Sequence, residues 1–162
     1  MKKLLCIFGA AAAAVWLGLL PFQATDAARL LPTQTVLLRK DGARYTVDVG
    51  AGVRGMGSTL TAALSALQEQ TAGTVFFDTC EQLLLAGDTD ALLPEIAGAE
   101  AFRPAADVYT VSAEPEIDKV SDYLNSHHGG VTVSDLRAAM AEEQPLRVPK
   151  LTEVGGGYRI IA

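Results

Sequence analysis

Two adjacent histidines are the residues whose type most readily suggests chemistry, because imidazole nitrogens bind metal ions. His127 and His128 are neighbours in the chain, and neighbouring side chains in a strand or loop usually point apart. No further candidate ligand stands at the spacing of a known metal site. We therefore interpret the pair as part of an exposed loop, Asn125–Gly130, and predict no metal site.

The second candidate is the thiol of Cys80, which lies close to Asp78 and Glu81. Neighbouring carboxylates raise the pKa of a thiol and weaken it as a nucleophile. A buried core thiol is the ordinary role of such a cysteine. The other cysteine, Cys6, lies in the N-terminal apolar run, so no intramolecular disulfide is expected if that run is removed.

Hydroxyl and carboxyl groups give no catalytic set either. Ser58 follows glycines but lacks the Gly-x-Ser-x-Gly turn that presents a nucleophile. The remaining acidic clusters fit solvated faces and helix ends better than paired general acids and bases. They are Glu114, Glu116, Asp118, Glu142 and Glu143. We predict no catalytic residue and no cofactor, and therefore no enzyme activity.

A glycine-rich segment, Gly50–Gly55, matches the Gly-x-Gly-x-x-Gly pattern of dinucleotide-binding loops, with Asp78 as a possible ribose partner. That function requires the glycines to join a strand directly to a helix in a βαβ unit. Here the preceding strand belongs to a predicted hairpin, and the next helix begins late, near Thr59. The pattern favours a glycine loop that leaves the hairpin.

The elements that must position these residues are clearest between Gly57 and Arg103. Leucines and alanines at helical spacing follow Ser58, an expected N-cap, and Gly73 is expected to end that helix in a left-handed conformation. Leu83-Leu84-Leu85 has no polar face, which is typical of a strand covered on both sides. The expected elements are a helix at Thr59–Gln70, a short strand at Thr74–Phe77, a central strand at Gln82–Ala86 and a helix from Asp88 to about Ile96.

A hairpin is predicted before this stretch, because Asp41-Gly42 separates the strand-like runs Val36–Arg39 and Arg44–Val49. Alternation in the second run puts Thr46 and Asp48 on a wet face. The fold class is therefore α/β (α+β), a single small domain with a mixed sheet and about four helices. The later elements are a strand at Asp107–Ala113, a helix opened by Glu116, a helix at Asp135–Glu143 capped by Ser134 with Leu136, Ala139 and Met140 inward, and strands at Leu146–Val154 and Tyr158–Ile161.

The N-terminus has the pattern of an export signal or a membrane anchor. Lys2 and Lys3 precede an uncharged apolar run, Leu4–Leu20, which would form a helix roughly 26 Å long, against the ~30 Å hydrocarbon core of a bilayer. Cleavage after Ala24 or Ala27 and retention as an anchor both stay open; either delivers the body of the chain outside the cytoplasm. The net charge of −6 argues against a nucleic-acid partner.

The order of the segments resembles the N-terminal domain of the Ger(x)C family, the C subunit of spore germinant receptors. The matching pieces are Gly57-Ser58-Thr59, Ala63-Leu64, Phe76-Phe77, Leu83–Gly87, Asp88–Ile96 and Arg103-Pro104, and the likeness extends over about residues 36–146. It implies a signal or anchor at 1–27, the Ger(x)C-like domain at 28–146, and a strand pair at 147–162 that starts a truncated second domain.

This resemblance implies a non-enzymatic subunit on the outer face of the spore inner membrane, in contact with membrane-embedded receptor subunits. Members of the family are lipoproteins with a cysteine just after the apolar run, whereas Cys6 lies inside that run, so lipidation is not expected here. The alternative is an exported small-molecule binding or hydrolytic domain, which needs a pocket with convergent polar groups.

Overall fold

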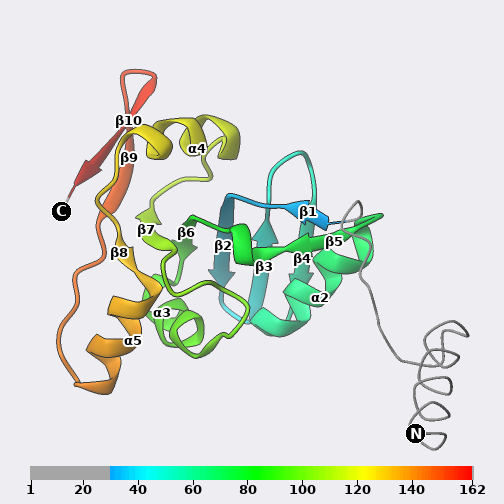
Figure 1. The fold of residues 1–162 in the computed structure, drawn as a ribbon, viewed down its shortest axis with the longest axis horizontal. Helices are drawn as coiled ribbons and strands as arrows, with labels where there is room; N and C mark the ends of the chain where they lie inside the picture. Colours follow the sequence, from blue (N-terminus) through cyan, green and yellow to red (C-terminus); the bar gives the residue numbers. More distant parts are fainter. Residues whose placement is uncertain (1–29, 162) are drawn as a thin grey trace, which may run out of the picture.

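The computed structural model describes residues 30–161, which form a mixed sheet with helices on both faces (Figure 1). The main sheet has the strand order β10-β9-β7-β6-β2-β3-β4, with β8 paired to β7. This confirms the predicted α/β class. The strands of this sheet are β2 (Thr35–Asp41), β3 (Arg44–Asp48), β4 (Arg54–Gly57), β6 (Gln82–Gly87), β7 (Asp107–Val111), β8 (Val131–Thr132), β9 (Lys150–Val154) and β10 (Gly157–Ile161).

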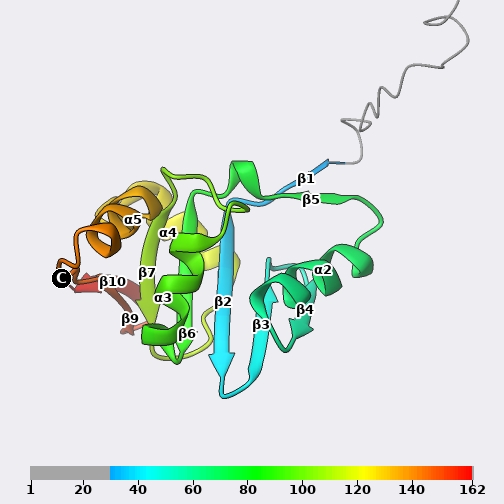
Figure 2. The same ribbon diagram turned by 90° about the horizontal axis from the view of Figure 1, so that it is seen from below.

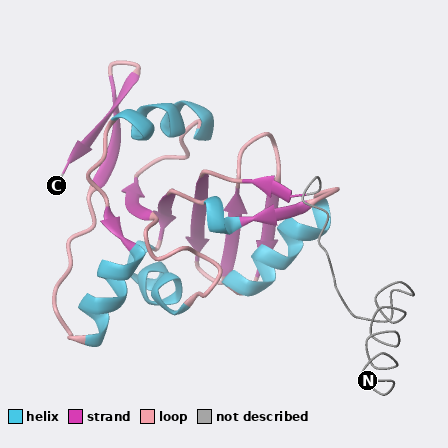
Figure 3. Ribbon diagram, viewed as in Figure 1, coloured by secondary structure: helices cyan, strands magenta, loops and turns pink. Residues whose placement is uncertain are grey.

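Within residues 30–161, four helices cover the sheet, three on one face and one on the other (Figures 2 and 3). The helices on the first face pack over a core that contains Leu83 and Leu85, whereas the single helix packs over Leu84. We call these the three-helix face and the one-helix face. The first carries α2 (Leu60–Gln70), α3 (Thr89–Gly98) and α5 (Val133–Ala141), and the second carries α4 (Ile117–Ser126).

The central strand β6 lies between β2 and β7, and both pairings are parallel. Its leucines Leu83, Leu84 and Leu85 are all fully buried. Successive side chains of a strand point to opposite faces, so an unbroken apolar run can fill two cores at once. The prediction of a strand covered on both sides is confirmed.

The predicted hairpin is also confirmed, because β2 and β3 pair antiparallel. The paired positions run from Leu37 opposite Asp48 to Asp41 opposite Arg44, and Gly42 in the turn has a φ of 60°. Asp48 lies on the polar side of β3 as expected. It is nevertheless only 8% exposed, because the guanidinium of Arg54 covers it with a bond of 2.6 Å.

Strand β4 approaches α2 at backbone distance, and two glycines make that approach possible. A Cβ atom added at Gly55 would lie 2.1 Å from the carbonyl oxygen of Ala63, and one at Gly57 would lie 2.5 Å from the Ala63 nitrogen. These distances are far below van der Waals contact, so the two positions require glycine.

A second, two-stranded sheet joins β1 (Leu30–Pro32) in parallel to β5 (Thr74–Phe76). No strand was predicted at Leu30–Pro32, so β1 is an addition to the expected elements. The two segments are distant in sequence, so local patterns gave no sign of the pairing. A 3-10 turn, η2 (Phe77–Thr79), links β5 to the main sheet.

The helix ends differ from the predicted ones at several positions. Thr59, not Ser58, caps α2, since its side chain accepts from the Ala62 amide at 3.1 Å. Gly73 is absent from the positive-φ glycines of the described residues; instead, the hydroxyl of Thr71 donates to the Gln68 carbonyl at the C-terminus of α2. Asp88 caps α3 as predicted.

The last helix begins earlier than expected. Thr132, rather than Ser134, caps α5 and forms a capping box with Asp135. The predicted inward position of Met140 is wrong, because that side chain is 42% exposed. The end of α5 at Ala141 is also earlier than the predicted Glu143.

The C-terminal strand pair forms, but β9 begins at Lys150, later than the predicted Leu146. Strand β9 pairs in parallel with β7 and antiparallel with β10. The pair was expected to open a second domain; within residues 30–161 it extends the main sheet. The predicted signal or anchor at 1–27 lies outside the described residues. Within residues 30–161, no helix is long and apolar enough to cross a membrane.

Candidate functional site

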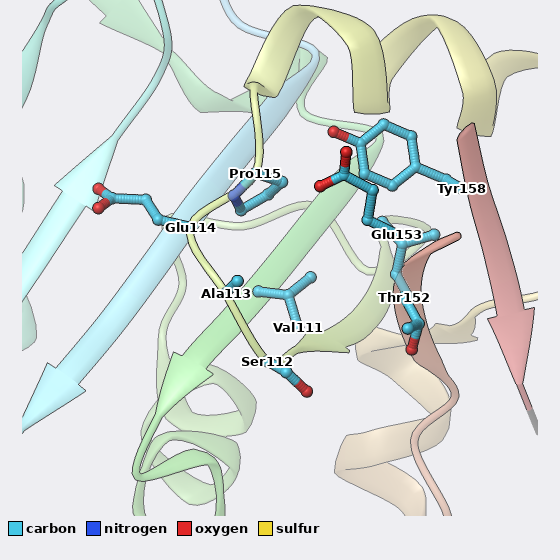
Figure 4. Close-up of a pocket in the computed structure, with 9 residues that line it drawn as sticks. Val111, Ser112, Ala113, Glu114, Pro115, Thr152, Glu153 and Tyr158 are labelled. Carbon is cyan, nitrogen blue, oxygen red and sulfur yellow. The ribbon is translucent and has the colours of Figure 1, made fainter. Parts of the chain in front are cut away.

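A small hollow lies where the chain leaves β7 and passes β9 and β10 (Figure 4). Parallel strands commonly place ligand sites at their carboxyl ends. The volume is about 170 Å³, below the ~300–1,000 Å³ of small-molecule sites. The lining residues are Val111, Ser112, Ala113, Glu114, Pro115, Leu151, Thr152, Glu153 and Tyr158.

The polar groups around this hollow do not converge on one point. Glu114 extends away from it, and Tyr158 and Glu153 lie together beneath α4 (Figure 4). Burial, followed by the charge of Glu153, raises the pKa of Tyr158. A tyrosine with a raised pKa stays protonated near neutral pH, so it supplies no phenolate base and is a weak acid. The hollow therefore holds room for a few water molecules but assembles no acid–base pair.

Glu114 instead belongs to an ion-pair cluster on the one-helix face. Arg54 donates from Nη2 to Asp48 Oδ2 at 2.6 Å and to Glu114 Oε1 at 2.5 Å. Arg39 pairs with Asp41 at 2.6 Å and lies 3.9 Å from Glu114. Hydrogen bonding to Asp48 is the main cause that raises the pKa of Arg54. The cluster links β4 to the loop after β7, which is a structural role.

A second polar cluster joins β2, β3 and α3 on the three-helix face. Glu95 Oε1 accepts from Lys40 Nζ at 3.0 Å and from the Tyr45 hydroxyl at 2.5 Å. The ammonium group also lies 4.8 Å from the centre of the Tyr45 ring. Hydrogen bonding to Tyr45 and then to Glu95 raises the pKa of Lys40. Catalytic lysines need a lowered pKa, so this arrangement stabilises the fold and does not activate the amine.

Cys80 is a buried core thiol, as predicted, with no exposed surface. Its Sγ donates to the Gln82 carbonyl at 3.4 Å. Burial raises its pKa to about 12, while the bond to Gln82 and the charge of Arg103 lower it; the predicted effect of Glu81 is present but is the smallest of these causes. A protonated thiol enclosed by the core is not a nucleophile.

His127 and His128 are both exposed. His127 follows α4, stacks on Tyr123 at 4.2 Å between ring centroids, and its Nδ1 lies 2.9 Å from the Tyr123 carbonyl oxygen. Within residues 30–161, no group of three or more His, Cys, Asp or Glu side chains is placed to hold a metal ion.

The glycine-rich segment Gly50–Gly55 joins β3 to β4, which pair antiparallel. Gly50, Ala51 and Gly52 have positive φ, and the Val53 amide donates to the Gly50 carbonyl at 3.0 Å. The segment is therefore the turn of a second hairpin and does not lead into a helix N-terminus as a dinucleotide loop does. Asp78, the possible ribose partner, is exposed on η2.

The other candidate residues are dispersed. Ser58 is exposed before α2, and Glu116, which precedes α4, pairs with Lys119 at 2.9 Å. Asp118 lies in the first turn of α4. Glu142 follows α5 and accepts from Gln144 at 2.8 Å, and the adjacent Glu143 has a φ of 53°. The structure brings none of these side chains together.

Sequence reasoning missed both polar clusters described above. Glu95 is 55 positions from Lys40 and 50 from Tyr45, and Glu114 is 60 from Arg54. Each of these charged residues, taken alone in the sequence, is typical of a solvated surface. No local pattern therefore predicts the ion pairs. Comparison of the chain with family models, with curated proteins and with solved structures gives no match.

Proposed function

We propose that this chain is a non-enzymatic, exported and membrane-associated subunit or accessory protein of a spore germinant receptor. It acts through contacts with the membrane-embedded receptor subunits. The observation that carries the proposal is the order and spacing of the segments between Gly57 and Pro104, which resemble the N-terminal domain of the Ger(x)C family.

The position of those segments in the fold supports the proposal. They form part of α2, the turn after β5, the central strand β6 and the capped helix α3. Most of their apolar residues pack on the three-helix face, whereas Leu84 and Ala86 pack on the one-helix face. Phe77 in η2 and Phe102, which follows α3, pack edge to face, with ring centroids 5.8 Å apart. The resemblance thus runs through residues that build the cores on both faces of the sheet.

The distribution of polar groups favours this function over an exported small-molecule binding or hydrolytic domain. That alternative would be favoured by a deep pocket at Cys80 or at the two histidines. Cys80, His127 and His128 do not line the hollow beside β7, β9 and β10. That hollow, of about 170 Å³, has no convergent polar groups. A protein whose work is binding another protein needs neither.

Affinity purification of the full chain from sporulating cells tests the proposal. The chain carries a C-terminal tag, and the matched control is residues 1–29 fused to an unrelated domain with the same tag. We expect mass spectrometry to show membrane-embedded receptor subunits enriched with the chain and not with the control. Equal recovery in both samples, or none in either, contradicts the proposal.

Membrane attachment is a separate question, which the variants Cys6→Ala and Val15→Asp address. We expect Cys6→Ala to leave membrane fractionation unchanged, because the apolar run itself provides the attachment. Val15→Asp is expected to disturb export, since aspartate at the centre of an inserting helix costs about 2.5–3.5 kcal/mol. Palmitate label that is present in the parent and lost in Cys6→Ala would show that the chain is a lipoprotein after all.

A further inference from the structure

A groove runs between α2 and the residues that follow α3, on the three-helix face. Its volume is about 500 Å³, and a shallower hollow of about 450 Å³ along the outer side of α2 shares Thr61 and Leu64 with it. Together the groove and this hollow extend along α2 as far as Glu69, and we call the pair the track. The lining of the groove includes Leu60, Leu64, Ala99, Ala101, Glu95 and Glu100.

The floor of the groove is apolar and only half covered. Leu60 and Leu64 are four positions apart in α2 and so lie on the same side of the helix. Leu60 is buried, whereas Leu64 and Ala99 pack partly against the core and stay half exposed. A partner that covers them would bury apolar surface that the fold itself leaves in water.

The stretch of chain that lines the groove carries charge of one sign. The 48 residues from Gly55 to Phe102 include no lysine or arginine, and they form α2, α3 and the loops that border the groove. The acidic residues in this stretch are Glu69, Asp78, Glu81, Asp88, Asp90, Glu95 and Glu100. Three of them, Glu69, Glu95 and Glu100, line the track.

Two cations from other segments, Lys40 and Arg137, are engaged by groups that border the groove. Lys40 donates to Glu95 at 3.0 Å, and Arg137 donates to the carbonyl oxygens of Ala97 and Ala99, both at 2.8 Å, which fixes the wall of the groove. Glu69 and Glu100 are exposed, and within residues 30–161 neither pairs with a basic side chain. Their charges are available to a partner.

We propose that this groove binds a cationic amphipathic segment of a partner protein. Apolar side chains of that segment cover Leu60 and Leu64, and its lysines or arginines lie beside Glu69 and Glu100. The choice of a protein partner rests on the proposed function; the apolar floor and the negative rim select its chemistry. Anionic lipid surfaces carry the same sign of charge as the rim and are repelled by it.

A binding measurement with a model peptide tests the inference. The probe is a fluorescent amphipathic helix of about 14 residues made of leucine and lysine, and its control has glutamate in place of lysine. The full chain is held in phosphatidylcholine nanodiscs, and the signal of empty discs is subtracted. We expect the lysine peptide to bind and the double variant Glu69→Lys/Glu100→Lys to lose at least tenfold in affinity.

The matched control variant is Glu142→Lys/Glu143→Lys, which makes the same charge change at the exposed end of α5. We expect it to keep most of the affinity. Equal losses in the two double variants would mean that net charge alone attracts the peptide, and would overturn the inference. Binding of the glutamate peptide as tightly as the lysine peptide would overturn it as well.

Two further measurements separate this inference from the proposed function. If receptor subunits co-purify equally with the parent and with Glu69→Lys/Glu100→Lys, the proposed function stands and the groove is not the contact. If the peptide binds as expected but no receptor subunit co-purifies, the groove stands and the proposed function fails. A dimer that light scattering detects in the parent and not in the double variant would make a second copy the occupant and overturn the inference.

Discussion

The three-helix face and the one-helix face of the same sheet are closed in different ways. Eighteen buried residues form the core of the first face and eight form that of the second. Three helices and the backbone contact at Gly55 close the first face, whereas α4 and the β9–β10 hairpin close the second (Figure 2). Beyond α4, the second face becomes polar over β3 and β4, where Asp48 and Arg54 pair.

This difference indicates which face can adjust. Arg137 fixes α5 to the carbonyls of Ala97 and Ala99 at the end of α3, and the close approach at Gly55 fixes α2 to β4, so these helices have little freedom to move inward. A single helix beside an edge hairpin has more. The cost of a core truncation depends on how far its surroundings can collapse, so equal truncations should cost more on the three-helix face.

Leu85→Ala and Leu84→Ala test that expectation directly, because the two residues are adjacent in β6, equally buried and on opposite faces. Each is expected to lower the free energy of unfolding by about 2–5 kcal/mol, with the larger loss for Leu85→Ala. Urea unfolding followed by circular dichroism measures both. A loss below about 1 kcal/mol for Leu84→Ala would place it outside the core, and a larger loss for Leu84→Ala than for Leu85→Ala would break the comparison.

Gly55→Ala tests the backbone contact that closes the three-helix face. The added Cβ would meet the Ala63 carbonyl at 2.1 Å and the Leu67 amide at 2.4 Å, so β4 or α2 must shift, at a cost of about 1–3 kcal/mol. The control is Gly98→Ala at the end of α3, where the new methyl meets nothing within 4 Å. We expect the control to be neutral or slightly stabilising. Equal melting temperatures for the two variants would mean that the Gly55 contact is not tight.

The two faces should also respond differently to alkaline pH. The pKa of Cys80 on the three-helix face and that of Tyr109 on the one-helix face both rise to about 12, from 9.0 and 10.0, mainly through burial. The folded chain keeps the Cys80 proton above pH 9, whereas the unfolded chain releases it. Unfolding therefore becomes easier as pH rises, by up to about 1.4 kcal/mol per pH unit.

Cys80→Ser in a Cys6→Ala background removes the thiol contribution. The hydroxyl keeps a donor for the Gln82 carbonyl, so we expect a cost of about 1 kcal/mol near pH 8 and a smaller fall in stability between about pH 8 and about pH 10 than in the parent. Tyr109→Phe should reduce that fall much less than Cys80→Ser does, because an unfolded tyrosine starts to ionise only near the upper end of this range. Urea midpoints at the two pH values measure it, and identical slopes for all three chains would contradict the assignment to Cys80.

The elements that sequence predicted well are those with a local physical signal. Leu83-Leu84-Leu85 has no polar face, Asp41-Gly42 favours a tight turn, and Asp88 can cap the residues that follow it. The small β1–β5 sheet had no such signal, because Leu30 and Thr74 pair across 44 positions. Neighbouring hydroxyls also compete to cap a helix, so Thr59 and Thr132 replaced the expected Ser58 and Ser134.

The sites were predictable to the extent that one residue's environment decides its chemistry. A cysteine next to a leucine strand is expected in the core, and Cys80 lies there. The groove beside α2 was not predictable, since it depends on where Ala99 and Glu100 lie relative to Leu64. A pattern along one helix states which residues share a side, but not what stands opposite them.

The smallest effect is expected at Arg54, where the one-helix face becomes polar. Its guanidinium bonds Asp48 and Glu114, but its side chain is 45% exposed, so Arg54→Ala should cost about 1 kcal/mol or less. Arg54→Lys keeps the charge without the forked geometry and should recover part of the loss. Urea unfolding at ~0.05 M and ~0.5 M sodium chloride measures both, and the difference between parent and Arg54→Ala should shrink at high salt. A loss well above 1 kcal/mol that salt leaves unchanged would mean that Asp48, left without its cover, is a buried charge. In that case the polar end of the one-helix face is as tightly built as its apolar end, and the contrast between the two faces is smaller than their cores indicate.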